Sequence, residues 1–81
     1  MVPSKKKILK DLDALVATNT GVYERCKAAF DDPARSLAER RQAAFLARDA
    51  LEQSLTYGRL AEQLRAGLID RSNAVFREIY R

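Results

Sequence analysis

A regular alternation of apolar and polar positions runs through the middle of the chain, from about residue 34 to residue 66. Apolar or small side chains recur there at alternating spacings of four and three residues: Ala43, Ala47, Ala50, Ser54, Tyr57, Ala61, Leu64 and Leu68. This spacing places them along one side of an α-helix. The pattern predicts one long helix. The side chains along this side, called the seam below, are small in the first half of the helix and larger in the second.

The expected ends of this helix are set by Pro33 and Gly67. Proline suits the first helical position, because its fixed φ and missing N–H cost nothing there. Ser36 and Glu39 have the spacing of a capping box, so either Asp32 or Ser36 is the expected N-cap. Gly67 favours a stop, because glycine accepts the left-handed conformation that ends many helices. The alternative is a helix that continues through Gly67, since apolar residues beyond it keep the phase.

The same spacing appears earlier, over about residues 4–31. Its members are Ile8, Leu12, Leu15, Asn19, Val22, Cys26 and Ala29. Ser4 can cap a helix that begins at Lys5. The stretch Thr18–Gly21 is poor in helix propensity, so a turn between two short helices is one interpretation. Because the phase continues across it without a slip, we favour one continuous helix.

A short connection at about residues 31–35 forces these two helices to run antiparallel. After Gly67, either Asp70 or Ser72 could cap a short third helix over about residues 70–80. Its apolar residues are Val75, Phe76, Ile79 and Tyr80. The predicted fold is all-α: a single small domain made of an antiparallel helical hairpin and a short C-terminal third helix.

The chain is short and has few means of stabilising itself. Below roughly 80 residues a single core supplies about 3–5 kcal/mol, and this chain has 81 residues with Cys26 as its one cysteine. Self-association or a protein partner is therefore expected. No apolar run is long enough for a membrane span. Charges interrupt the apolar N-terminal segment where a signal peptide would need its core, so a cytoplasmic protein is predicted.

Several classes of chemistry are excluded by composition. There is no histidine, so a Ser-His or Cys-His nucleophile cannot be built, and one cysteine cannot make a zinc site. The three glycines form no phosphate-binding loop. The one adjacent pair of carboxylates, Asp31-Asp32, is explained by capping of the turn. The chain is predicted not to be an enzyme, and no metal or cofactor is expected.

Apolar side chains beyond those that two helices need for each other are the candidates for a protein interface. They are Phe45, Leu46, Leu60, Phe76, Ile79 and Tyr80. The alternative interpretation is that Phe76 and Tyr80 only close a three-helix core. The formal net charge is +4, and a basic cluster near the N-terminus gives the candidates for nucleic-acid binding. They are Lys5, Lys6, Lys7 and Lys10.

The second helix of this basic hairpin follows a short turn and contains the run Ala50-Leu51-Glu52-Gln53-Ser54-Leu55. In these features, residues 22–64 resemble the small co-chaperones of type III secretion systems. In that family a helical hairpin sits beside a larger helical-repeat chaperone, and the two hold the needle subunit before export. Needle subunits are themselves helical hairpins with a proline-containing turn, but their characteristic turn sequence is absent from this chain.

The sequence therefore predicts protein binding without catalysis, by a small adaptor, co-chaperone or inhibitor that acts through an apolar helical face. One alternative is a regulatory protein that binds nucleic acid through the basic N-terminus and the arginines. Another is a structural subunit that assembles with copies of itself.

Overall fold

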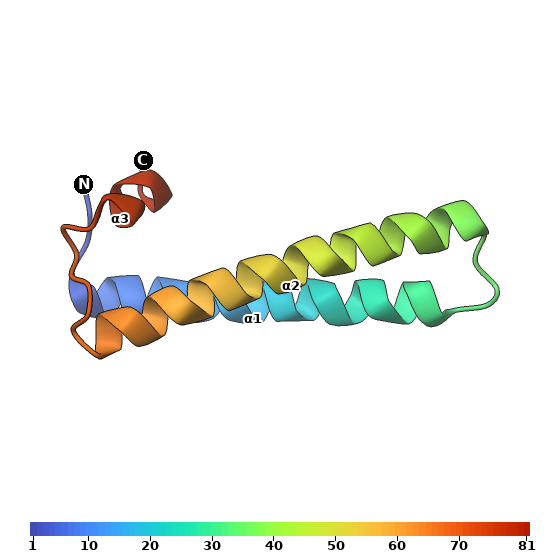
Figure 1. The fold of residues 1–81 in the computed structure, drawn as a ribbon, viewed down its shortest axis with the longest axis horizontal. Helices are drawn as coiled ribbons and strands as arrows, with labels where there is room; N and C mark the ends of the chain where they lie inside the picture. Colours follow the sequence, from blue (N-terminus) through green and yellow to red (C-terminus); the bar gives the residue numbers. More distant parts are fainter.

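The computed structural model describes residues 1–81 and contains three helices and no strand. Helix α1 spans Lys5–Asp31, α2 spans Leu37–Arg65 and α3 spans Ala74–Ile79. The two long helices lie side by side in opposite directions, and α3 lies at the end of the hairpin that holds both chain termini (Figure 1). The predicted fold class, an all-α antiparallel hairpin with a short third helix, is confirmed.

Helix α1 is continuous, as favoured above, and the alternative turn at Thr18–Gly21 is wrong. Ser4 caps it, because the Ser4 hydroxyl accepts a hydrogen bond from the Lys7 backbone N–H at 3.3 Å. Asn19 does not interrupt the helix, since its side-chain amide donates to the Leu15 carbonyl of the same helix at 2.9 Å.

Helix α2 begins at Leu37, later than the predicted start near residue 34. Its N-cap is Ser36, and the capping box is complete: the Glu39 N–H donates to Ser36 Oγ at 3.1 Å, and the Ser36 N–H donates to Glu39 Oε1 at 3.3 Å. Asp32, the alternative cap, instead accepts from the Ala34 N–H at 3.0 Å. This bond makes a turn around Pro33, so the proline lies in the connection and not at the first helical position.

Removing the Ser36 hydroxyl should destabilise the hairpin measurably. We expect Ser36→Ala to lower the free energy of unfolding by about 1 kcal/mol, because the Glu39 N–H at the start of α2 loses its acceptor. Urea denaturation followed by circular dichroism measures this loss. Thr56→Ala, an exposed hydroxyl in the middle of α2, is the control and should change stability by less than about 0.5 kcal/mol. Equal midpoints for the two variants would contradict the capping box.

Gly67 ends α2, and the alternative of a helix running through it is wrong. Its φ is 75°, in the left-handed region, and the Leu68 N–H returns to the Gln63 carbonyl at 2.9 Å. Helix α3 is capped by Asn73, whose side chain accepts from the Val75 N–H at 3.0 Å. Neither Asp70 nor Ser72 is the cap. The Asp70 carboxylate binds the Ser72 N–H instead and shapes the preceding turn.

Only eight side chains are buried, and they divide by size along the hairpin. Near the turn they are the alanines Ala43, Ala47 and Ala50 of α2; near the termini they form a cluster of Ile8, Leu12, Ala61, Leu64 and Phe76. The predicted gradient from small to large seam residues is present. Leu68 is the exception: it is exposed, because the helix has already ended.

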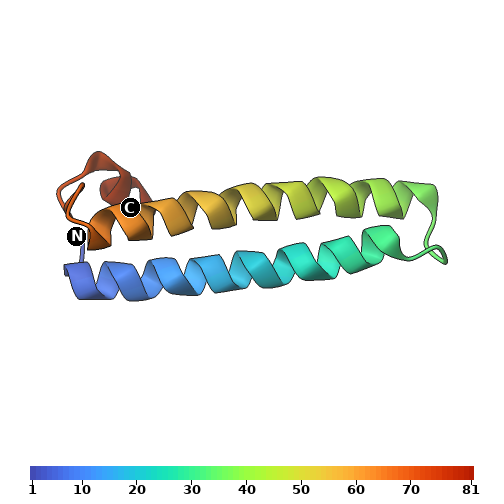
Figure 2. The same cartoon turned by 60° about the horizontal axis from the view of Figure 1, so that its bottom comes forward.

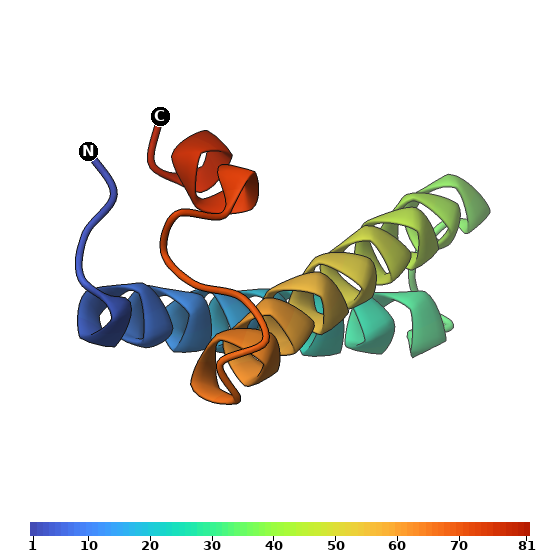
Figure 3. The same cartoon turned by 60° about the vertical axis from the view of Figure 1, so that its left-hand side comes forward.

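Helix α3 is attached by its side chains. No Cα atom of α3 lies within 8 Å of a Cα atom in α1 or α2. The α3 ribbon stands apart from the hairpin in Figures 1 and 3, whereas in the view of Figure 2 it overlaps the end of α2. Phe76 bridges the gap and is fully buried. The Tyr80 hydroxyl donates to Asp11 Oδ2 at 2.6 Å, and Arg71 donates to the Val2 carbonyl at 2.9 Å. The terminal end of the hairpin is thereby closed.

Candidate protein-binding surfaces

The six candidate interface residues separate into two groups. Phe76 belongs to the buried cluster, and Leu60, Ile79 and Tyr80 pack against it. These four side chains complete the core around α3, which is the alternative interpretation given above. Fully buried, Phe76 cannot contribute to an outward-facing surface.

Phe45 and Leu46 remain exposed. The Phe45 ring is 72% exposed and lies among Arg48, Asp49 and Glu52, on the outer side of α2. Leu46 faces a groove between the two long helices near the turn. The two side chains lie on different surfaces although they are adjacent in sequence, because neighbouring positions on a helix point about 100° apart.

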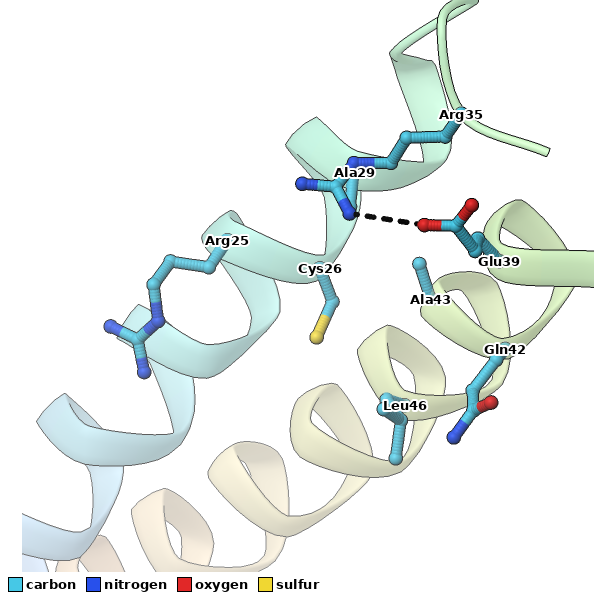
Figure 4. A pocket seen from close by; sticks show the side chains of 8 residues that line it. All are labelled: Arg25, Cys26, Ala29, Arg35, Glu39, Gln42, Ala43 and Leu46. Carbon is cyan, nitrogen blue, oxygen red and sulfur yellow. Dashed lines mark ion pairs between the residues drawn. The ribbon is translucent and has the colours of Figure 1, made fainter.

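The groove beside Leu46, called the turn groove below, is the uncovered continuation of the flank on which α3 lies. Its apolar floor consists of Cys26, Ala29, Ala43 and Leu46, and its rim of Arg25, Arg35, Glu39 and Gln42. Figure 4 shows the Cys26 thiol pointing toward α2 and the ion pair between Arg35 and Glu39, which are 3.7 Å apart, across one end. Leu46 lies two heptads before Leu60, so the two share one stripe of α2. Helix α3 covers only Leu60.

A second apolar surface, called the uncovered face below, runs from the middle of the hairpin to the turn. It consists of Val16, Tyr23 and Phe30 of α1 and of Leu37, Ala44, Leu51 and Leu55 of α2. The three members in α1 are seven residues apart. Those in α2 are also seven residues apart, except that Leu55 follows Leu51 by four. Each set therefore forms one stripe on its helix. Leu37 and Leu55 are the most exposed members, at 63% and 59%.

Three contacts show that the two stripes lie on the same side of the hairpin. The hydroxyls of Thr20 and Ser54 are 3.2 Å apart. Val16 and Leu55 line one shallow hollow. Arg40 donates from Nε to the Phe30 carbonyl at 2.7 Å, and its guanidinium carbon lies 5.6 Å from the centre of the Phe30 ring. Helix α3 is bound on the opposite flank, so nothing within the chain covers this face.

The uncovered face is not among the surfaces predicted from the sequence. The signal that identifies the face is the second heptad ribbon that each helix carries beside its seam. Such a ribbon is superfluous in an isolated pair of helices, because each helix needs only one seam for its partner.

The N-terminal lysines are exposed and project from the first turns of α1. Lys7 is paired with Asp11, whose Oδ1 lies 2.7 Å from the Lys7 ammonium nitrogen. Lys5, Lys6 and Lys10 form no ion pair within the chain. A hollow lined by Ser4, Lys6, Lys7 and Lys10 contains no aromatic side chain. Nucleic-acid binding by this cluster stays a prediction.

Asp11 joins the basic N-terminus to α3. The hydrogen bond from Lys7, followed by that from Tyr80, lowers the pKa of Asp11. Burial, together with the hydrogen bond to Asp11, raises the pKa of Tyr80 from 10.0 to about 12. A raised pKa favours the neutral phenol in the folded chain. The stability that this contact contributes is therefore present below pH 10.0 and is lost as the pH rises through about 12.

Alkaline titration should detach α3 before it melts the hairpin. We expect hydrogen exchange of residues 74–80 to accelerate between pH 10.0 and about 12 in the wild type, relative to the exchange rate of unstructured peptides at each pH. Tyr80→Phe should lack this step, because it has no phenol to ionise. Subtracting the two profiles removes the titration of the lysines and of the other tyrosines. Identical profiles would contradict the role of the Asp11–Tyr80 contact.

The described side chains offer little for other kinds of site. No three His, Cys, Asp or Glu side chains are gathered where they could hold a metal ion. None of the helices combines the length and apolar character needed to cross a membrane. No protein-family model matches the chain, and searches of curated proteins and of solved structures give no match.

Proposed function

We propose that this protein is a non-catalytic protein-binding module, a small adaptor, co-chaperone or inhibitor, that receives one helix of another protein in the turn groove. The observation that supports this proposal is the unfinished flank of the hairpin. Helix α3 covers Leu60 at the terminal end, while Leu46, on the same stripe of α2, stays 44% exposed.

The groove has the shape that a helix needs. Ala29 and Ala43 place no bulk between the two long helices, and Cys26 is nearly as small. Small side chains allow a third helix to approach closely, with its own larger residues inserted between the ridges. Leu46 supplies an apolar wall for such an anchor. A partner helix in the groove would lie on the same flank of the hairpin as α3, nearer the turn.

Charge defines the partner further. Arg25, on the rim, forms no ion pair within the chain, whereas Arg35 is paired with Asp32 and Glu39. A carboxylate beside the apolar stripe of the partner helix would meet the Arg25 guanidinium. The expected partner therefore presents an amphipathic helix with aliphatic anchors and at least one acidic residue. The resemblance to type III secretion co-chaperones, which hold a helical subunit, agrees with this proposal.

A retention experiment with matched variants tests the proposal. The tagged chain is immobilised and exposed to lysate of its native source, and retained polypeptides are identified by mass spectrometry. Leu46→Glu places a charge in the groove and should reduce retention of the partner at least about tenfold. Leu68→Glu, an exposed position outside the groove, should retain it fully. Equal retention by both variants would contradict the proposal, provided circular dichroism shows both to be folded.

Nucleic-acid binding is the alternative, supported by the three N-terminal lysines that lack carboxylate partners. It predicts retention on immobilised DNA or RNA that falls steeply as salt rises, because bound phosphates release counterions. Lys5→Gln combined with Lys6→Gln and Lys10→Gln should abolish that retention. Absence of retention at moderate salt would reject this alternative and leave the protein-binding proposal intact.

A further inference from the structure

The chain exposes more surface than a compact protein of its size. Its accessible surface is 5876 Å², whereas a folded monomer of 9.1 kDa exposes about 4,900 Å². The excess of about 1,000 Å² compares with the roughly 800 Å² that each partner buries in a standard protein interface. The radius of gyration is 15.7 Å, against about 12 Å for a compact chain of this length. One interface along the hairpin would account for the difference.

The uncovered face occupies the turn-side part of the hairpin, which is 47 Å long in all. Its apolar side chains lie from Val16 and Leu55, near the middle of the seam, to Phe30 and Leu37, beside the turn. The stretch of α2 from Leu37 to Leu55 is about 27 Å long. Large exposed apolar patches mark interaction surfaces. This face is distinct from the turn groove, which lies on the flank of α3.

We infer that a second copy of this chain covers the uncovered face, with the two hairpins antiparallel about a two-fold axis that passes beside Thr20 and Leu55. The two residues lie at the same level, since Thr20 contacts Ser54, the neighbour of Leu55. In this arrangement α1 faces α1 of the second copy and α2 faces α2. Every neighbouring pair of helices is then antiparallel, and the dimer is a four-helix bundle.

Charge selects the antiparallel arrangement. The side chains seven residues from the axis differ in charge: Lys27 and Arg48 are basic and lie toward the turn, whereas Asp13 and Glu62 are acidic and lie toward the termini. Within the chain, Asp13 pairs with Arg65 at 2.6 Å and Arg48 with Glu52 at 3.3 Å, while Lys27 and Glu62 form no ion pair. A two-fold axis at the centre places Lys27 opposite Asp13 of the second copy, and Arg48 opposite its Glu62. A parallel arrangement would instead place α1 over α2 at equal levels. Lys27 would then lie near Arg48, and Asp13 near Glu62, which is unfavourable for like charges.

The same axis also matches large side chains to small ones. Leu51 lies four residues from the centre on the turn side, and Gly58 lies three residues from it on the other. On the uncovered face Gly58 leaves a notch, because a Cβ atom there would have only Val16 Cγ2, at 3.9 Å, as its nearest neighbour. Leu51 of one copy can therefore insert beside Gly58 of the other. Tyr23 correspondingly faces Val16 of the second copy.

Sedimentation equilibrium of the full chain tests the inference, from micromolar to sub-millimolar concentration. The wild type should reach twice the mass of 9.1 kDa. Leu55→Asp, which places two carboxylates at the axis, should raise the dissociation constant at least about tenfold. Leu68→Asp, exposed and off this face, should leave it unchanged. A wild type that stays monomeric throughout, or a Leu55→Asp variant that dimerises as well as the wild type, would overturn the inference.

Charge reversal and cross-linking test the orientation. Lys27→Glu and Asp13→Lys should each weaken the dimer. The double variant should dimerise more tightly than either single variant, because the pair across the interface is inverted, although Asp13→Lys also breaks the ion pair with Arg65 within the chain. In a Cys26→Ser background, Thr20→Cys should form a disulfide-linked dimer on oxidation, since Thr20 faces its own copy at the axis. A parallel dimer would instead place Thr20 beside Ser54 and give no such product. Either failure would overturn the antiparallel arrangement.

The groove variant separates this inference from the proposed function. Leu46→Glu should dimerise like the wild type while losing the heterologous partner. If a different protein from the lysate binds the uncovered face, so that Leu55→Asp abolishes its capture while the wild-type chain alone stays monomeric, the second copy is the wrong occupant. The proposed function would survive that result, because it depends on the turn groove.

Discussion

Phe76→Ala is expected to lower the free energy of unfolding by about 3–5 kcal/mol, the range for truncating a buried aromatic side chain. Phe76 is 0% exposed and is the one residue of α3 in the buried cluster with Ile8, Leu12, Ala61 and Leu64. We therefore expect α3 to separate from the hairpin in this variant. Urea denaturation and hydrogen exchange of residues 74–79 measure the effect.

Phe45→Ala is the matched control for this prediction, because it removes the same atoms from a ring that is 72% exposed. Its free energy of unfolding should change by less than about 0.5 kcal/mol. If the two phenylalanines cost the same when truncated, α3 is not seated in the core as described.

Leu64→Ala is expected to cost about 2–5 kcal/mol and to loosen the hairpin itself. Leu64 is 1% exposed and packs where α1 and α2 both meet α3. Exchange protection should therefore fall in the first turns of α1 as well as in α3, whereas Phe76→Ala should affect mainly α3. The melting temperature should drop by about 4–8 °C for each kcal/mol lost. If the hydrogen-exchange protection of α1 stays at its wild-type level in Leu64→Ala, Leu64 does not have this shared role.

Leu68→Ala is the control for Leu64. Both leucines belong to the spacing read from the sequence, but Leu68 follows the helix end at Gly67 and is exposed. We expect no measurable loss of stability from it. The pair thus tests whether the seam ends where the structure places the end of α2.

The long helices were predictable because their signals are local and repeated. Each heptad of the seam confirms the phase of the last, which is why the weak stretch at Thr18–Gly21 did not break α1. The end of α2 at Gly67 was predictable from the residue type alone, because glycine readily adopts the positive φ that ends a helix. The start of α2 was misjudged, because Asp32 and Ser36 are both good caps and only the turn around Pro33 decides between them.

The division of the surplus apolar residues was not predictable. Phe45 and Phe76 look alike in sequence, yet one is exposed and the other is the centre of the core. The difference depends on where six residues of α3 dock, and a helix that short has no periodicity to reveal its buried face. The heptad spacing of the uncovered face is visible in the sequence. It runs directly beside the seam that α1 and α2 share, so spacing alone does not separate the two surfaces.

We propose three roles for the two flanks of one hairpin. On the first flank, α3 closes the terminal end and the turn groove would receive a partner helix; on the second, the uncovered face would receive a second copy. Nothing in these roles requires catalysis. For a small chain with eight buried side chains, the proposed association would add stability, because a partner that binds only the folded state shifts the equilibrium toward it.

The central claim, a hairpin closed by α3 on one flank and uncovered on the other, is tested most directly by hydroxyl-radical footprinting of its three phenylalanines. They share one chemistry and differ in exposure, at 72% for Phe45, 42% for Phe30 and 0% for Phe76. In dilute protein we predict oxidation in that order, with Phe76 protected. As the protein is concentrated, Phe30 should become protected while Phe45 stays reactive. Oxidation of Phe76 as fast as Phe45, or a Phe30 that is already protected at high dilution, would contradict the account.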